Sequence, residues 1–195
     1  MKITLLRHAK TEGNLQYRYV GITDDSLSQE GINHALSLGP DTSVMKVFTS
    51  ELQRTQHTAQ LLFPQAEIIA LSGLNEMDFG SFEGRTAAEM EHESSYRDWI
   101  EGKCEGPCPD GEDRDSFTRR CVDTFLKVLA NEEQEESVFV VHGGTIMAIM
   151  NTLALPVKSL YEWMPLNCGG YIVAYDRTEQ GDRPLRLLES VRNKE

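Results

Sequence analysis

Short apolar runs alternate with amphipathic segments along most of the chain, and few fold classes accommodate that pattern. The runs ITLLR, VMKVFTS and VFVVHGG have the length and apolar content of strands that are buried on both sides. Segments with apolar residues at helical spacing lie between them. This alternation predicts an α/β fold, a three-layer α/β/α sandwich with a mostly parallel central sheet.

Several helix boundaries can be predicted from capping residues. In SQEGINHALSLGP a helix is expected to begin near Ser28 and to end at the Gly-Pro pair, because serine is a good N-cap and glycine and proline terminate helices. Ser50 and Gln53 have the spacing of a capping box. They predict a second helix, which carries Arg54 in its first turns.

The other segments are assigned in the same way. A loop, LSGLNEMDFGSFEGR, is expected to last until a capping box formed by Thr86 and Glu89. CEGPCPDGEDRD is predicted to be a second long loop, followed by a helix from about Asp115 to Ala130. A helix in TIMAIMNTLAL is expected to stop at Pro156. AEIIA is a short predicted strand, and GGYIVAYD and LRLLES are two late strands expected to form a hairpin.

Length and charge narrow the function classes. With 195 residues, we expect a single domain over residues 1–195. A net charge of -12 opposes nonspecific binding to nucleic acid or anionic membrane, but it permits a small cationic pocket for an anionic substrate. No apolar run approaches the ~20 residues of a membrane span, and no secretory signal is evident. We therefore expect a cytoplasmic protein, either a monomer or a homodimer, with no nucleic-acid or membrane partner.

The four cysteines do not follow a metal-binding pattern. Their spacing contains no paired CxxC motif. The expected state is free thiols in a reducing cytosol, with zinc binding and disulfide formation as the alternatives. The cysteines are Cys104, Cys108, Cys121 and Cys168.

Basic residues and histidines gather where the predicted strands end. Arg7 and His8 follow the first strand, Arg54 follows the second, and His142 follows VFVV. Ligands of open α/β sheets bind beyond the carboxyl ends of the strands, where the helix N-termini after Ser50 and after HGG add N–H donors. Two guanidinium groups are suited to a phosphate dianion. The sequence contains neither GxxxxGK[ST] nor GxGxxG, so a nucleotide-binding loop is not indicated.

Four motifs in this order and at this spacing resemble those of the histidine phosphatase superfamily, also called the phosphoglycerate mutase-like family. They are LRHAKTEGN, SELQRTQHTA, LNEMDFGSFEG and VVHGG. The match covers nearly the whole chain and implies a phosphoglycerate mutase-like fold. Within the superfamily the chain looks most like the short bacterial phosphatases, which include α-ribazole phosphatases.

The resemblance implies a metal-independent enzyme without a cofactor. His8 would attack phosphorus and become phosphohistidine, which water would hydrolyse to release inorganic phosphate. Arg7, Arg54 and His142 would hold the phosphoryl oxygens, and Glu76 would protonate the leaving oxygen. Further substrate contacts are expected from Thr11, Asn14, Gly21 and Gly143.

Two features of the motifs leave alternatives open. Asp78 and Glu83 lie in the same loop as Glu76, so each is a rival candidate for the acid. Ala9 stands where the family usually has glycine, which requires a negative φ at this residue. Lys10 replaces a common acidic residue and is expected to make the rim of the site more basic.

Three functions fit the sequence. The leading hypothesis is a phosphatase for a small phosphomonoester, with α-ribazole 5'-phosphate of cobalamin biosynthesis ahead of sugar phosphates, phosphoglycerates and nucleotides. A phosphoglycerate mutase is the first alternative, although the segment from Gly84 to Asp115 is short for such an enzyme. A noncatalytic phosphate-binding module is the second, and it would have no need for the acid.

Overall fold

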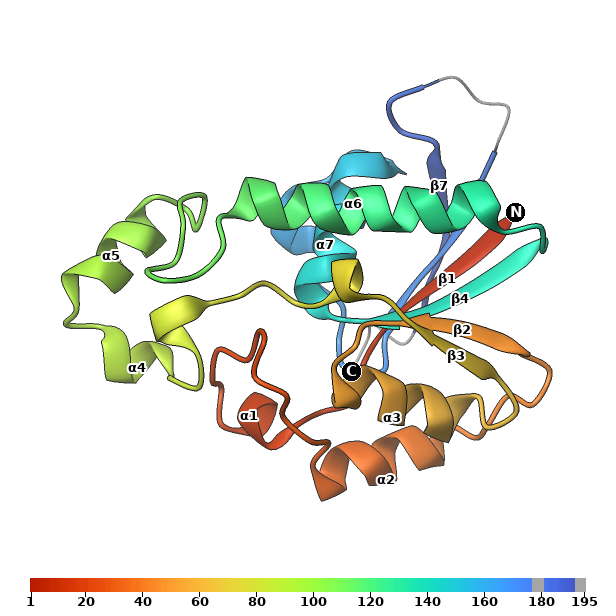
Figure 1. The fold of residues 1–195 in the computed structure, drawn as a ribbon, viewed down its shortest axis with the longest axis horizontal. Helices are drawn as coiled ribbons and strands as arrows, with labels where there is room; N and C mark the ends of the chain where they lie inside the picture. Colours follow the sequence, from red (N-terminus) through yellow and green to blue (C-terminus); the bar gives the residue numbers. More distant parts are fainter. Residues whose placement is uncertain (177–180, 192–195) are drawn as a thin grey trace.

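A seven-stranded sheet with the order β3-β2-β4-β1-β6-β7-β5 organises the molecule (Figure 1). The computed structural model describes residues 1–176 and 181–191. Strands β3, β2, β4 and β1 run parallel to one another, β6 is antiparallel to both β1 and β7, and β5 is parallel to β7. The strands are β1 (Lys2–Arg7), β2 (Lys46–Thr49), β3 (Glu67–Ala70), β4 (Glu136–Val141), β5 (Ala154–Leu155), β6 (Gly170–Tyr175) and β7 (Leu185–Val191).

Helices cover both faces of the sheet, which confirms the predicted three-layer sandwich with a mostly parallel sheet. Helices α6 and α7 pack on one face, and α2 and α3 pack on the other (Figure 1). The α-helices are α1 (Glu12–Leu15), α2 (Gln29–Ser37), α3 (Gln53–Leu62), α4 (Ala87–Met90), α5 (Ser94–Glu101), α6 (Arg114–Asn131) and α7 (Gly143–Leu153), and three 3-10 turns are η1 (Ser72–Leu74), η2 (Gly80–Phe82) and η3 (Leu160–Trp163).

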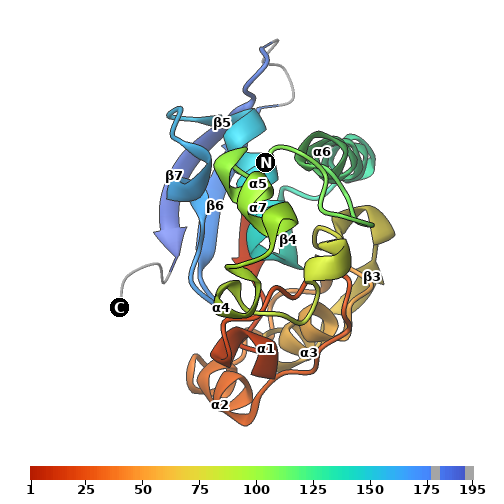
Figure 2. The ribbon, with the colours of Figure 1, turned by 90° about the vertical axis from the view of Figure 1, so that its left-hand side faces the viewer.

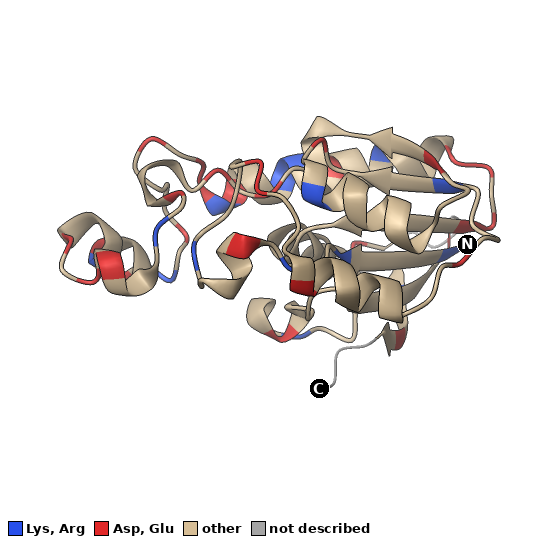
Figure 3. Cartoon of the chain, turned by 90° about the horizontal axis from the view of Figure 1, so that it is seen from below, with Lys and Arg blue, Asp and Glu red and all other residues tan. Residues whose placement is uncertain are grey.

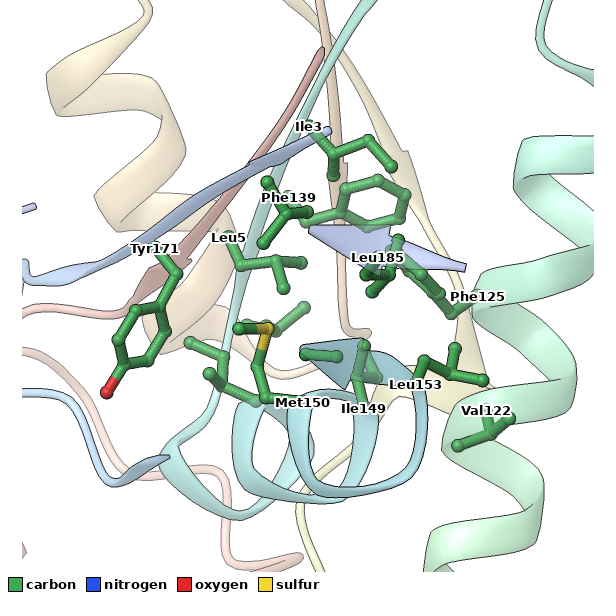
Figure 4. Packing of buried hydrophobic residues seen from close by; sticks show 14 of the residues in the cluster. Ile3, Leu5, Val122, Phe125, Phe139, Ile149, Met150, Leu153, Tyr171 and Leu185 are labelled. Atoms are coloured by element: carbon green, nitrogen blue, oxygen red, sulfur yellow. The ribbon is translucent and has the colours of Figure 1, made fainter. Parts of the chain in front are cut away.

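The sequences of the central strands β2 and β4 are continuous apolar runs, because alternate side chains of each strand pack into two different cores. Phe48 and Phe139 stack with ring centroids 5.0 Å apart in the core under α6 and α7, part of which is seen in Figure 4. Their neighbours Val47 and Val140 point to the opposite core, against Ala59 of α3. Burial on both faces therefore explains why β2 and β4 lack a polar face, whereas the outer strand β7 carries exposed polar residues.

Most of the predicted element boundaries are confirmed. Ser28 is the N-cap of α2 and accepts a hydrogen bond from the Gly31 N–H. Thr86 and Glu89 form the capping box of α4. Strands β6 and β7 form the expected antiparallel pair, and α6 begins one residue before the predicted Asp115.

Two predicted helix ends are wrong. Ser50 does not cap α3, which begins at Gln53 with Leu52 at the N-cap and no capping side chain, because the Ser50 hydroxyl is hydrogen-bonded inside the protein. The helix predicted in TIMAIMNTLAL starts at Gly143 and ends at Leu153. Its last two expected residues form β5, which pairs with β7.

The segment that contains α4 (Ala87–Met90) and α5 (Ser94–Glu101), for most of which no element was predicted, projects beyond the carboxyl ends of β1 and β4. It extends away from the sheet (Figures 1 and 2). Helix α5 was not predicted. A separate apolar cluster, which includes Phe82, Tyr96 and Trp99, joins this segment to Phe117 of α6 and Ala148 of α7.

The described chain carries charges of both signs on its loops and helices (Figure 3), and its four cysteines are reduced. Acidic residues are spread over many loops and helices, with basic residues between them (Figure 3). No disulfide joins the four cysteines, all of which lie in the described part of the chain. Across residues 1–176 and 181–191, no helix has both the length and the apolar content needed to cross a membrane.

Candidate active site

The two histidines meet because β1 and β4 are parallel and in register. Arg7 is the register partner of Val141, so the residues that follow, His8 and His142, lie side by side at the same edge of the sheet. Their ring centroids are 5.2 Å apart with an interplanar angle of 65°. His8 is 4% exposed and His142 is 0% exposed, so both imidazoles are shielded from bulk water.

The hydrogen bonds of His8 fix its tautomer. Its Nδ1 lies 2.7 Å from the carbonyl oxygen of Ala9, and a carbonyl can only accept, so Nδ1 carries the hydrogen. The Nε2 lone pair is then available for nucleophilic attack. Burial lowers the pKa of His8 well below its usual value, and the nearby Arg54 and Arg7 guanidinium groups lower this pKa further. His8 is therefore neutral at physiological pH.

Alanine is tolerated after His8 because the backbone there is not left-handed. Ala9 does not have a positive φ, which confirms the expectation for a residue that replaces glycine. Its N–H donates to the Thr58 hydroxyl of α3. Lys10 forms an ion pair with Glu30, with 2.8 Å between Nζ and Oε1, so the positive charge that it adds to the rim is offset.

His142 is held between an arginine and a serine. The Arg54 Nε–H donates to Nδ1 of His142 at 3.2 Å, and the Nε2 of His142 lies 2.8 Å from the Ser50 hydroxyl oxygen. Nδ1 must be the unprotonated nitrogen because an Arg N–H cannot accept, so Nε2–H donates to Ser50. Burial lowers the pKa of His142 well below its usual value, and the Arg54 charge acts in the same direction. The ring is thus neutral and immobilised.

Arg54 is oriented by backbone carbonyls. Its Nη1 donates to the Thr23 carbonyl at 2.7 Å, and its Nη2 donates to the Gly21 carbonyl at 2.6 Å. Its side chain is 1% exposed. A buried guanidinium held by carbonyls and an imidazole keeps its full positive charge within the site.

Arg7 presents an unused donor. Its Nη1 donates to the carbonyl of Pro165 at 3.0 Å, whereas its Nε is buried and has no hydrogen-bond partner among the described residues. A Cβ on Gly143 would lie 3.4 Å from this Nε and 2.8 Å from the sulfur of Met164. Glycine at position 143 therefore leaves room beside the guanidinium.

Glu76 lies on the N-terminus of α7. Its Oε2 accepts from the Gly144 N–H at 2.9 Å, and its Oε1 accepts from the Met77 N–H at 3.0 Å. Burial raises the pKa of Glu76 more than these two N–H groups and the arginines lower it. A Cβ on Gly144 would lie 2.2 Å from Oε1, so the carboxyl group requires glycine there. A buried carboxyl group with a raised pKa can hold a proton and donate it.

The rival carboxylates have different surroundings. Glu76 lines the cavity that Arg7 also lines, whereas Asp78 and Glu83 line a separate hollow. Asp78 accepts from the Gly80 N–H at 2.8 Å. Of the three candidates, Glu76 alone lies in the cavity beside Arg7.

The predicted substrate contacts are distributed over different structural roles. Asn14 and Gly143 line the cavity, and the Oδ1 of Asn14 accepts from the Thr11 N–H at 3.2 Å. Thr11 is fully buried and its hydroxyl caps α1. Gly21 uses its carbonyl to hold Arg54. Substrate binding by these four residues stays a prediction.

Three polar residues support the site in ways that no sequence pattern indicated. Ser50 contacts His142, as described above, and Asn167 donates from Nδ2 to the His8 carbonyl at 2.9 Å. Arg120 donates to the Glu76 carbonyl at 2.8 Å and so fixes the backbone that carries the acid. Each acts through tertiary contacts between distant segments, which no local pattern reveals.

Glu83 holds the loop that holds Arg54. Its carboxylate accepts from the N–H groups of Gly21 and Ile22 at 3.1 and 3.0 Å, and from the Thr23 hydroxyl at 2.6 Å. The carbonyls of Gly21 and Thr23 are the ones that receive the Arg54 guanidinium. Glu83 is therefore a positioning residue for Arg54.

Replacing Glu83 with glutamine is expected to lower kcat/KM and phosphate affinity about 10- to 100-fold. The amide NH₂ would face N–H donors and displace the loop, and small displacements of a charged clamp have effects of about this size. The measurement is kcat/KM for an aryl phosphate together with Ki for inorganic phosphate. Asp110→Asn, which removes a charge beside Glu83 in the same hollow, is the control; an equal change in that variant would contradict the positioning role.

No group of three or more His, Cys, Asp or Glu side chains is arranged to hold a metal ion within residues 1–176 and 181–191.

Comparisons with known proteins agree with the motifs. The profile of the histidine phosphatase superfamily (branch 1) matches residues 3–183. The adenosylcobalamin/α-ribazole phosphatase of Salmonella typhimurium (strain LT2) is 32% identical over 172 residues, which are 84% of this chain and 85% of that protein.

Solved structures show the same fold. The α-ribazole phosphatase of Shigella flexneri superimposes with a TM-score of 0.78 and 25% identity, over 95% of this chain and 96% of that one. A phosphoglycerate mutase of Thermus thermophilus gives a TM-score of 0.69 and 25% identity, over 98% of both chains.

Proposed function

The chain belongs to branch 1 of the histidine phosphatase superfamily, and from this premise we propose that it hydrolyses a small phosphomonoester through a phosphohistidine on His8. One observation carries the proposal. The neutral His8, with its Nδ1–H held by Ala9, is flanked by the charges of Arg7 and Arg54. A nucleophile with a free Nε2 beside two guanidinium groups is suited to attack on a phosphate dianion.

Binding of the phosphoryl group would use charge that the fold has already oriented. A phosphomonoester carries about -1.5 to -2 charges near neutral pH. Arg7 brings a buried Nε–H that has no hydrogen-bond partner in the described part of the chain, and Arg54 brings a guanidinium fixed by carbonyls. The N-terminus of α7, an 11-residue helix, adds a positive dipole end. Binding of His142 to a phosphoryl oxygen would require it to exchange Ser50 for the oxygen as acceptor of its Nε2–H.

In the first chemical step, His8 Nε2 forms a bond to phosphorus while the ester P–O bond breaks. The departing oxygen takes the proton of Glu76, so the alcohol leaves neutral and Glu76 becomes a carboxylate. The two arginines stabilise the equatorial oxygens as charge develops on them. The Ala9 carbonyl stabilises the positive charge that forms on the imidazole through the Nδ1–H bond.

In the second step, water attacks the phosphohistidine. The new P–O bond forms as the P–N bond breaks, and the water proton passes to the Glu76 carboxylate. Inorganic phosphate leaves, and His8 and Glu76 return to their initial protonation states. Glu76 thus acts first as an acid and then as a base, which its position at the cavity beside the N-terminus of α7 allows.

The substrate proposed first is α-ribazole 5'-phosphate. This assignment is supported by the similarity to the Salmonella and Shigella α-ribazole phosphatases. The short segment between Gly84 and Asp115 favours hydrolysis over a mutase reaction and does not distinguish among phosphomonoesters.

A panel of phosphomonoesters assayed in EDTA tests the proposal. We expect hydrolysis of an aryl phosphate without added metal, and the highest kcat/KM in the panel for α-ribazole 5'-phosphate over phosphoserine, 3-phosphoglycerate and a sugar phosphate. Absence of phosphate release from every compound would contradict a phosphatase function. A clear preference for another compound would keep the phosphatase function and reject the proposed substrate.

A further inference from the structure

A cavity of about 430 Å³ opens beside Arg7 and Glu76, and its size is that of a small-molecule site. It lies between the projecting segment with α5 and the first turns of α6 and α7; these three helices are labelled in Figure 2. Arg7, Asn14 and Glu76 line its phosphoryl end. Most of the other walls are apolar, with side chains that include Tyr19, Phe79, Trp99, Phe117, Met147 and Tyr161.

Two aromatic side chains of the cavity wall, Tyr19 and Trp99, use their polar atoms in hydrogen bonds with other protein groups. The Tyr19 hydroxyl is hydrogen-bonded to the Tyr96 hydroxyl at 2.9 Å. The Trp99 Nε1–H donates to the Gly106 carbonyl at 3.2 Å. The rings of Tyr19 and Trp99 also contact each other edge to face, with centroids 5.8 Å apart. These side chains therefore offer the cavity ring surface rather than hydrogen-bonding groups.

Two other arginines that line the cavity already form ion pairs with glutamates. Besides Arg7, the described lining contains Arg18 and Arg114. Arg18 pairs with Glu89 at 3.3 Å, and Arg114 pairs with Glu105 at 2.6 Å. Both signs of charge are visible over this projecting segment in Figure 3. A carboxylate on the leaving group would meet guanidinium groups that already have anionic partners, so its desolvation would not be repaid.

We propose that this cavity binds the leaving group and selects uncharged aromatic or bulky apolar alcohols over alcohols that carry a carboxylate. The inference rests on the proposed phosphatase function and deepens it by naming the substrate class. The aromatic walls stabilise a ring by apolar contact and edge-to-face packing. The paired arginines give serine- or glycerate-like leaving groups no compensating charge.

Three alkyl phosphates with the same three-carbon attachment separate these effects. They are 3-phenylpropyl phosphate, propyl phosphate and 3-phosphooxypropanoate, and the reacting ester is primary in each. We expect kcat/KM for 3-phenylpropyl phosphate to exceed that for propyl phosphate by about 10- to 100-fold. We expect kcat/KM for propyl phosphate to exceed that for 3-phosphooxypropanoate by about 10-fold or more.

Two variants locate the preference in the cavity. Tyr161 is 60% exposed, so Tyr161→Ala is expected to keep the fold and to lower kcat/KM about 3- to 10-fold for the phenylpropyl ester with no change for propyl. Glu105→Gln removes the partner of Arg114 and is expected to raise kcat/KM several-fold for the carboxylate compound only. Thermal unfolding of each variant checks that the fold is intact.

Different results would reject the proposed leaving-group preference and the proposed phosphatase function. If propyl phosphate is hydrolysed as well as the phenylpropyl ester, or if the carboxylate compound is preferred, the inference is overturned and the phosphatase function stands. The same holds if both variants leave the three ratios unchanged. If the aryl phosphate is hydrolysed but none of the three esters is, the inference alone is overturned; if the aryl phosphate is not hydrolysed either, both are overturned.

Discussion

Replacement of His8 by alanine is expected to lower kcat by about 10⁴-fold or more for aryl and alkyl phosphates alike, the size found for other catalytic nucleophiles. The methyl group of alanine cannot form the N–P bond, and no other imidazole nitrogen in the pair is available, because both ring nitrogens of His142 already have partners. Phosphate release measured in EDTA checks the result.

The same variant is expected to keep its fold and to bind inorganic phosphate. Arg7 and Arg54 remain in place, and their contacts to Pro165 and to Gly21 do not involve the imidazole. His34 on α2 has no assigned role, so His34→Ala is the control and should retain full activity. Retention of more than about 1% of wild-type kcat in His8→Ala would contradict a covalent role for His8.

Glu76→Gln is expected to have the second largest effect, and one that depends on the leaving group. With alkyl phosphates, kcat/KM should fall by about 10²- to 10⁴-fold, because a poor leaving oxygen needs a proton as it departs. With a 4-nitrophenyl ester, whose leaving group is stable as an anion, the fall should stay below about 10-fold. Equal losses for both classes would reject Glu76 as the acid.

The pH dependence provides a second test of Glu76. Burial raises the pKa of this carboxyl group above its usual value, so the protonated form persists to a higher pH than for an exposed glutamate. With alkyl esters, wild-type kcat/KM should decline as pH rises through this raised pKa, and the decline should be absent from Glu76→Gln. Asp78→Asn, which alters a neighbouring carboxylate in the same loop, should keep the wild-type profile.

The fold and the central pair of histidines could be predicted because they depend on repeated local patterns. ITLLRH and VFVVH each end an apolar run with a histidine. Parallel pairing of β1 with β4 in register then places His8 beside His142. Arg54 lies in the first turn of α3, as its place after the second apolar run predicts, although Ser50 does not cap this helix.

Features that depend on distant side chains could not be predicted. Ser50 has the spacing of a capping residue, yet it binds His142, which lies 92 positions later. Glu76 and Glu83 share one loop, and only the structure shows one carboxylate buried at the cavity and the other accepting N–H groups of residues 21–23. The aromatic cavity depends on α5, whose short sequence carried no recognised signal.

Rapid-quench trapping of the phosphoenzyme tests the central claim most directly. Wild-type protein is mixed with a ³²P-labelled phosphomonoester, quenched in alkali within milliseconds, digested and analysed for the labelled peptide. Covalent catalysis by His8 predicts an acid-labile, alkali-stable phosphohistidine at this residue that forms and decays at least as fast as turnover. Turnover without any labelled protein, or with the label on a residue other than His8, would contradict it.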